Sequence, residues 1–211
     1  MLQFLRNLNL RRKYGAPIIV VSGLPRSGTS MMMNMLRAAD LPIVTDEQRT
    51  ADEDNPKGYF EDERVKNLDK STDNAWLGDC QGKVVKIISF LLMDLPADHH
   101  YKVIFMRRDF EEVIASQNKM LVRRNEPVGS REDDEKMIRR YEMHLRKTEF
   151  LLEEEPNYDH IDVGYTEALQ QPRECARRIC SFLGMKLDAD KMVEVVDRSL
   201  YRNRRARVEA S

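Results

Sequence analysis

The sequence has no long uninterrupted run of apolar residues. Charged residues make up 34% of the chain, and no segment approaches the roughly 20 apolar residues that a membrane-spanning helix needs. The amino-terminal stretch MLQFLRNLNLRRKYG intersperses its apolar residues with Asn and Arg, unlike the continuous apolar core of an export signal. We therefore expect a cytoplasmic protein with no transmembrane segment and a short surface helix over residues 2–12.

A large excess of one charge is also missing. The 211 residues include 35 Lys and Arg against 36 Asp and Glu, a formal net charge of −1. General nucleic-acid binders usually carry a large basic excess, so this balance argues against nucleic acid as a partner. It leaves room for a local basic pocket that binds one anionic ligand.

Cysteine is scarce, and its spacing indicates neither a disulfide framework nor a metal site. Cys80, Cys175 and Cys180 form no CxxC pair and have no metal-ligand spacing with the four histidines. Free thiols of this kind are typical of a reducing compartment. The sequence therefore predicts buried or half-buried thiols and no metal site.

Short apolar runs and helical patterns alternate along the chain. Strands are expected at 18–21, 84–89, 102–106 and 161–163, and helices at 31–40, 61–73, 107–120, 131–155, 172–183 and 188–196. Strands that alternate with helices predict a parallel sheet covered on both faces. We expect one three-layer α/β/α domain over residues 1–211, with a mostly parallel central sheet. Its core spans 15–184, and a helix with a basic tail follows at 185–211.

The strongest functional signal is IIVVSGLPRSGTS, residues 18–30, in which an apolar strand leads through a tight loop into a helix. A helix N-terminus offers unpaired N–H groups and partial positive charge, and glycine lets the backbone approach a phosphate closely. The sequence therefore predicts a phosphate cradle made of Gly23, Leu24, Pro25, Arg26, Ser27, Gly28, Thr29 and Ser30.

This loop lacks the lysine of nucleotide-hydrolysing P-loops. Its spacing nearly matches G-x-x-x-x-G-K-[ST], but Thr29 stands at the lysine position and Arg26 is the only cation within the loop. Enzymes that cleave ATP or GTP place that lysine on the β- and γ-phosphates. The loop is thus expected to hold a phosphate that is not part of a triphosphate.

The segment GLPRSGTS resembles the 5′-phosphosulfate-binding loop of sulfotransferases that use 3′-phosphoadenosine 5′-phosphosulfate (PAPS). That family has a P-loop-like fold and carries a basic residue followed by Ser-Gly-Thr-Thr/Ser, without the lysine. The resemblance places Arg26 at the basic position and residues 27–30 around the 5′-phosphate.

A second segment, KVIFMRRDFEEVIASQ, resembles the 3′-phosphate motif of the same family, with an arginine at a strand end and a serine eight residues later. Arg108 and Ser116 occupy these positions, and an arginine offers a planar fork of donors to a phosphate. Asp109 departs from the Pro or Asn that often follows the arginine. We expect Asp109 to cap the next helix.

A third segment, IDVGYTEALQQPRECARRICSFLG, resembles a family stretch with a tyrosine, a helix-opening proline and a Phe-Leu-Gly end. The resemblance places Tyr165 near the adenine of the donor. The three segments lie in the family's order between residues 18 and 184.

At the position of the catalytic base, the sequence differs from that of the best-known cytosolic members, which have a Lys-x-His sequence after a strand. Lys86 matches the lysine, but Ile88 takes the place of the histidine. His99 and His100 precede the next strand and are expected in a loop.

Bacterial and carbohydrate-directed members use a glutamate instead, and NPKGYFEDE, residues 55–63, resembles their segment. We expect Glu61 to be the base, with Asp62 and Glu63 as rivals, and a simple helix-start carboxylate as the alternative. Arg26 is assigned to stabilising the bridging oxygen as the donor leaves.

These features predict a sulfotransferase that transfers a sulfuryl group from PAPS to a hydroxyl, or an amine, of a small-molecule, glycan or lipid acceptor. No metal is required. The alternatives are a catalytically weak protein that binds PAPS or 3′,5′-bisphosphoadenosine (PAP), and a kinase-like P-loop enzyme. The short chain leaves little room for an acceptor-binding insertion, so a partner subunit in a homo-oligomer could complete the pocket. The basic tail with Arg202, Arg204, Arg205 and Arg207 either closes over the 3′-phosphate or is solvated.

Overall fold

The computed structural model of the protein describes residues 2–46, 48, 58–71, 73–197 and 199. Its centre is a four-stranded sheet in the order β2-β1-β3-β4, and every pairing in it is parallel. The strands are β1 (Ile18–Gly23), β2 (Val84–Lys86), β3 (Tyr101–Arg107) and β4 (Tyr158–Gly164). The predicted parallel α/β architecture is therefore confirmed.

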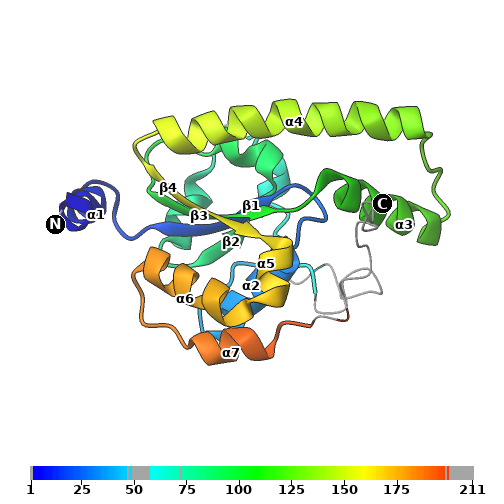
Figure 1. Cartoon of the computed structure of the whole chain (residues 1–211). Coiled ribbons are helices and arrows are strands. Elements are labelled where there is room, and N and C mark those ends of the chain that lie inside the picture. The colour runs from blue at the N-terminus through cyan, green and yellow to red at the C-terminus, as the bar shows by residue number, and fades with distance from the viewer. Residues whose placement is uncertain (1, 47, 49–57, 72, 198, 200–211) are drawn as a thin grey trace.

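Helices cover both faces of the sheet (Figure 1). The α-helices are α1 (Leu2–Tyr14), α2 (Thr29–Ala38), α3 (Phe110–Arg123), α4 (Arg131–Glu154), α5 (Tyr165–Gln170), α6 (Pro172–Leu183) and α7 (Ala189–Glu194). Three short 3-10 helices are η1 (Val65–Asn67), η2 (Ala75–Cys80) and η3 (Ser89–Asp94). One core lies between the sheet and α2, α6 and α7, and a second lies on the face covered by α4 and the 3-10 helices.

The central strand β1 explains why the sheet needs two covering layers. All six of its residues are buried, and its sequence IIVVSG begins with four β-branched residues that suit a strand. Ile19 and Val21 face the core that contains the methionines of α2, whereas Ile18 and Val20 face the opposite core. Because successive side chains of a strand point to opposite faces of the sheet, β1 contributes buried side chains to both faces.

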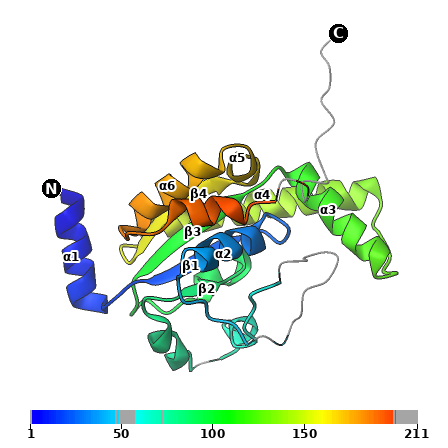
Figure 2. The ribbon, with the colours of Figure 1, turned by 90° about the horizontal axis from the view of Figure 1, so that it is seen from below.

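The strand order places a topological switch point between β1 and β3. β1 connects to β2 on one side, while β3 connects to β4 on the other, so the chain changes direction between β1 and β3. In open parallel sheets, ligands bind outside the carboxyl ends of the strands at such a point. Figures 1 and 2 show α3 at this edge and α1 at the opposite end of the sheet.

The prediction of a helix over residues 61–73 is wrong, apart from the single 3-10 turn η1. The Asp62 carboxylate accepts hydrogen bonds from the backbone N–H of Arg64 (3.0 Å) and from its guanidinium (2.7 Å). The backbone N–H of Glu63 donates to the Asp46 carboxylate (2.7 Å). Such side-chain acceptors compete with helical carbonyls for backbone donors, so a regular helix does not propagate.

Element ends also differ from the expectation at two strands. β2 stops at Lys86, and η3 begins at Ser89, where a strand was predicted to continue. β4 starts at Tyr158 because Tyr158 and Asp159 pair with Tyr101 and Lys102 of β3. Pairing across the sheet, which is not encoded in local periodicity, decides both ends.

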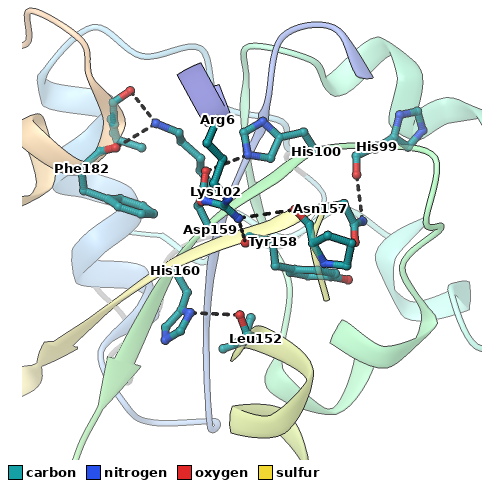
Figure 3. A network of polar contacts seen from close by, with 12 residues as sticks. Arg6, His99, His100, Lys102, Leu152, Asn157, Tyr158, Asp159, His160 and Phe182 are labelled. Carbon is teal, nitrogen blue, oxygen red and sulfur yellow. Dashed lines mark hydrogen bonds and ion pairs between the residues drawn. The ribbon is translucent and has the colours of Figure 1, made fainter. Parts of the chain in front are cut away.

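The amino-terminal helix α1 is attached at the amino ends of the strands (Figure 3). Arg6 forms an ion pair with Asp159 and also donates to the Tyr158 carbonyl (3.1 Å). The ring of His100 donates from Nε2 to the same carboxylate at 2.9 Å. Burial alone would raise the pKa of Asp159, but the hydrogen bonds from His100 and Arg6 bring it below its usual value.

Among the described helices, none is both long and apolar enough to cross a membrane. Cys80 and Cys175 are buried free thiols, and Cys180 is partly buried. Burial raises the pKa of Cys175 to about 12, which keeps this thiol protonated and unreactive at neutral pH.

Candidate active site

The loop between β1 and α2 is wound tightly against its neighbours. Gly28 caps α2 with φ 101°, and Gly23 ends β1 with φ 146°. A Cβ on Gly28 would lie 2.5 Å from the ring of Tyr165, and one on Gly23 would lie 2.6 Å from the Met106 carbonyl. Both positions therefore require glycine, and the loop takes the form of a backbone cradle at the N-terminus of α2.

Some of the predicted phosphate-binding residues are buried within the loop itself, whereas Ser30 contacts a neighbouring segment. Leu24 and Ser27 are buried, and the Ser27 backbone N–H donates to the Leu24 carbonyl at 3.1 Å to close a turn. The Ser27 hydroxyl faces Gly23 and has no hydrogen-bond partner among the described residues. The Ser30 hydroxyl instead accepts a hydrogen bond from Lys86 Nζ at 3.2 Å, so it faces the residues that follow β2.

Arg26 joins the loop to the motif that follows β3. Its Nε donates to the Ser116 hydroxyl at 3.0 Å, and its carbonyl accepts from Nη1 of Arg108 at 2.9 Å. Arg26 has φ 69°, a left-handed conformation that costs a non-glycine residue free energy and that clusters at functional sites. The two segments that the sequence singled out, about 80 residues apart, thus form one structure.

The Arg108 side chain is buried and contacts both an aromatic ring and a carboxylate. Its guanidinium lies 4.3 Å from the ring centre of Tyr165, a cation–π contact. Its Nε donates to Glu112 at 3.1 Å, and both side chains are only 6% exposed. Glu112 was missed at the sequence level, although its i,i+4 spacing from Arg108 on α3 was a usable signal.

The expected cap at Asp109 is present. The Asp109 carboxylate accepts hydrogen bonds from the backbone N–H groups of Glu111 (2.9 Å) and Glu112 (3.2 Å) at the start of α3. This arrangement stabilises the first turn of α3 and turns the Asp109 charge toward the helix. Ser116, one of the predicted phosphate ligands, is buried two turns further along the same helix.

Lys86 and Glu61 lie together beside the phosphate loop. Lys86 Nζ donates to the Tyr59 carbonyl at 2.8 Å and lies 3.5 Å from Oε1 of Glu61. The Lys86 side chain is 8% exposed and that of Glu61 is 24% exposed, so the carboxylate remains accessible from one side. The lysine therefore connects the predicted base to Ser30 at the start of α2.

The two rival carboxylates are engaged elsewhere. Asp62 is buried and paired with Arg64, whose hydrogen bond lowers the pKa of Asp62 below its usual value. Glu63 is half exposed and paired with Lys66 on the surface at 2.5 Å. Of the three acids in this segment, Glu61 is the one whose carboxylate reaches Lys86.

The histidines lie away from this cluster. His99 and His100 fall in a loop, as expected, but they belong to the network at the amino ends of the strands (Figure 3). Sequence reasoning missed His144 of α4, which is hydrogen-bonded through Nε2 to Ser89 at 2.9 Å. The described residues contain no group of three or more His, Cys, Asp or Glu side chains arranged to hold a metal ion. The arginines of the basic tail and residues 55–57 lie outside the described residues.

Comparisons with known proteins identify the fold. Residues 99–189 match the family model of the sulfotransferase family. The chain also superimposes on the sulfotransferase domain from the curacin biosynthetic pathway with a TM-score of 0.52 and 18% identity, covering 86% of this chain and 78% of that one. The chain has the sulfotransferase fold. The resemblance inferred from the three sequence motifs is thereby confirmed.

Two further sulfotransferase-fold structures were solved with PAP. Mouse sulfotransferase SULT7A1 complexed with PAP gives a TM-score of 0.52 at 15% identity and covers 88% of this chain. The match spans 63% of the mouse chain, so this chain corresponds to less than two thirds of that protein. Retinol dehydratase in complex with androsterone and inactive cofactor PAP gives 0.51 at 17% identity, covering 94% of this chain and 70% of that one. No curated protein sequence matches the chain.

The matched family region and the phosphate loop are different parts of this sulfotransferase fold. Residues 99–189 include Arg108, Ser116 and Tyr165 but not the loop at residues 23–30. The contacts of Arg26 with Ser116 and Arg108 connect the two parts. The region matched by the family model and the loop at residues 23–30 therefore meet at the same edge of the sheet.

Proposed function

We propose that the chain is a sulfotransferase that transfers the sulfuryl group of PAPS to a hydroxyl of a small-molecule, glycan or lipid acceptor. One observation carries this proposal: Arg26 of the phosphate loop is bonded to both Ser116 and Arg108 of the second motif. The two segments that the sequence predicts to bind phosphates therefore lie side by side, and a nucleotide phosphorylated at both its 5′ and 3′ positions has the matching pair of charges.

The donor-binding residues fit such a nucleotide. The backbone of residues 23–30 and the hydroxyls of Thr29 and Ser30 would hold the 5′-phosphate at the N-terminus of α2. Arg108 and Ser116 would hold the 3′-phosphate, and Tyr165 would lie near the adenine. A bound 3′-phosphate would compete with Glu112 for the Arg108 guanidinium.

The catalytic roles follow from the cluster beside the loop. Glu61, as a carboxylate, would take the proton of the acceptor hydroxyl while that oxygen bonds to sulfur. The bond between sulfur and the bridging phosphate oxygen breaks, and the electron pair stays on that oxygen. Arg26 and Lys86 would stabilise the resulting negative charge, since Lys86 already contacts Ser30 of the loop.

A ligand comparison tests the donor. Binding to the folded state alone raises the melting temperature, so we expect PAP to stabilise the protein more than ATP-Mg or GTP-Mg does. A larger shift with ATP-Mg would contradict the proposal and support a kinase-like enzyme. Transfer of labelled sulfate from PAPS to a panel of alcohols and amines then tests the reaction.

A second candidate is a PAPS- or PAP-binding protein without catalysis. The observation that favours it is Ile88, an exposed apolar residue at the position where cytosolic members carry their histidine. This candidate predicts the same stabilisation by PAP but no transfer of labelled sulfate to any acceptor. The panel of acceptors therefore separates the two candidates.

A further inference from the structure

Phe60, the residue before the predicted base, has a backbone conformation that phenylalanine rarely adopts. Its φ is 53°, in the left-handed region, where the Cβ of a bulky residue crowds the neighbouring carbonyl oxygen. Such a conformation costs free energy and persists only where the surrounding structure holds it. Contacts of the Phe60 ring and of the backbone on either side hold it here.

The Phe60 ring is packed against α2. It is 8% exposed and belongs to the core that contains the methionines of this helix. The guanidinium of Arg37, also on α2, lies 4.7 Å from the ring centre, a cation–π contact. Arg37 is itself held by the side-chain oxygen of Asn34, which accepts from Nη2 at 2.8 Å. The ring is therefore fixed to the helix that begins at the loop of residues 23–30.

The backbone of Glu61 is connected to strand β2. Its carbonyl accepts a hydrogen bond from the Thr45 hydroxyl at 3.0 Å. The preceding residue, Val44, donates its backbone N–H to the Val84 carbonyl of β2 at 2.8 Å. Because β2 ends at Lys86, these contacts fix the Glu61 backbone with respect to that lysine.

The turn at Phe60 brings groups from both of its neighbours to one ammonium group. Lys86 Nζ donates to the Tyr59 carbonyl at 2.8 Å and lies 3.5 Å from the Glu61 carboxylate. A left-handed residue bends the chain sharply, so groups before and after it can reach the same point. Extended backbone at Phe60 would instead carry the chain onward from the Tyr59 carbonyl.

We infer that Phe60 is a positioning residue: its ring, fixed to α2, and its left-handed backbone hold the Tyr59 carbonyl and Glu61 against Lys86. The role of Glu61 as base rests on the proposed function, whereas the placement of Lys86 does not. Lys86 Nζ also donates to Ser30 in the first turn of α2, so Phe60 sets this cluster relative to the loop of residues 23–30. Displacing a reacting group by about 1 Å can cost about 10²-fold in rate.

Lysine labelling tests the placement without requiring turnover. The Lys86 side chain is 8% exposed, and loss of a packed ring opens its surroundings locally. We expect reductive methylation of Lys86, followed by mass spectrometry, to be at least about tenfold faster in Phe60→Ala. Lys102 is the internal reference, because it is 7% exposed and donates to carbonyls at the end of α6. Its rate should not change, and Phe60→Leu, which refills most of the volume, should label Lys86 slowly again.

Kinetics test the consequence for catalysis. We expect the kcat for transfer of labelled sulfate to fall by about 10²-fold in Phe60→Ala, while the Kd for PAP stays near wild type. Ile179→Ala is the matched control, because it removes a buried side chain of α6 from the same core. It should leave kcat and the labelling of Lys86 near wild type.

Three results in Phe60→Ala would overturn the inference: unchanged labelling of Lys86, equal acceleration at Lys102, or wild-type kcat. If Phe60→Ala does not fold, Arg37→Ala takes its place, because it uncovers the ring without leaving a cavity in the core. Unchanged labelling of Lys86 in that variant would likewise overturn the inference. A wild-type protein that transfers no sulfate would refute the proposed function, whereas the labelling would still decide whether Phe60 holds Lys86.

Discussion

At the scale of single residues, Glu61 is distinguished from its neighbours by one contact. Its carboxylate lies 3.5 Å from Lys86 Nζ, while Asp62 is paired with Arg64 and Glu63 with Lys66. Glu61 is therefore the acid of this segment that lies beside the start of α2, because Lys86 also contacts Ser30. The three acids of one short segment therefore have different expected effects when neutralised.

Replacing the predicted base should separate catalysis from binding. Glu61→Gln keeps the shape but removes the proton acceptor, so we expect transfer of labelled sulfate to fall by about 10²–10⁴-fold. The PAP-induced rise in melting temperature should remain. Glu63→Gln, an adjacent surface substitution, is the control and should retain activity. Full turnover by Glu61→Gln would remove Glu61 from the mechanism.

A second residue-scale prediction concerns Gly28. A Cβ there would lie 2.5 Å from the Tyr165 ring, and φ 101° is itself unfavourable for alanine. We expect Gly28→Ala to abolish stabilisation by PAP, because the cradle at the start of α2 must shift. Gly82→Ala is the matched control, since Gly82 has φ 74° but nothing within 4 Å of its Cβ position. It should lose about 1–2 kcal/mol of stability and still bind PAP. Equal PAP responses in the two variants would contradict the steric argument.

At the scale of elements, α1 is attached to the sheet through a shared carboxylate. Asp159 of β4 accepts hydrogen bonds from Arg6 of α1 and from His100 before β3 (Figure 3). Lys102, also in this network, donates to the carbonyls of Phe182 (2.8 Å) and Leu183 (3.1 Å) at the end of α6. These polar groups connect elements from both ends of the chain.

The Asp159 network predicts an acid-dependent part of the stability. The pKa of Asp159 is lowered in the folded state, so the folded protein binds fewer protons than the unfolded one near that pKa. Its contribution is therefore complete above the ordinary value of 3.8 and is lost as the pH falls through the lower folded value. We expect Asp159→Asn to cost about 1–3 kcal/mol at pH 7 and less at pH 3. Urea unfolding at both pH values measures the difference.

The control for this experiment is Asp162→Asn, because Asp162 is a half-exposed member of the same strand that pairs with Arg107. A surface pair of this kind contributes little, so the loss at pH 7 should be below about 1 kcal/mol. The argument fails if Asp159→Asn destabilises the protein equally at both pH values.

At the scale of the whole molecule, the proposed donor site joins segments that follow β1 and β3, while α1 lies at the other end of the sheet (Figure 2). A ligand that binds both segments should stabilise them together and leave the far end unaffected. The sheet provides the rigid connection, because β1 and β3 are paired along six residues.

Hydrogen exchange measures this coupling. We expect saturating PAP to slow amide exchange in residues 23–30 and 108–116, with no change in α1. Arg108→Ala should weaken PAP binding by about tenfold or more, the loss of a charge-assisted hydrogen bond, and reduce protection in both segments at a fixed PAP concentration. Protection confined to residues 23–30 would show that the ligand does not span the two motifs.

The sequence alone determined the features that depend on local pattern. The β-branched run at 18–21, the glycines of the loop at residues 23–30 and the proline and glycine at the ends of α6 specify their own conformations, so the parallel sheet was predicted correctly. The phosphate-binding role of the loop stays a prediction. The Asp109 cap was predictable for the same reason. The helix expected at 61–73 failed because tertiary hydrogen bonds to Asp62 and Asp46 replaced the helical ones.

Only the tertiary structure decided which residues meet. The contact of Lys86 with Glu61, the hydrogen bond of Arg26 with Ser116, and the stack of Phe90 on His144 depend on the packing of separate elements. Phe90 and His144 come from η3 and α4, and no periodicity in either segment specifies their contact. Local propensities act over a few residues, whereas the chemistry of this site depends on distances between residues that the sheet brings together.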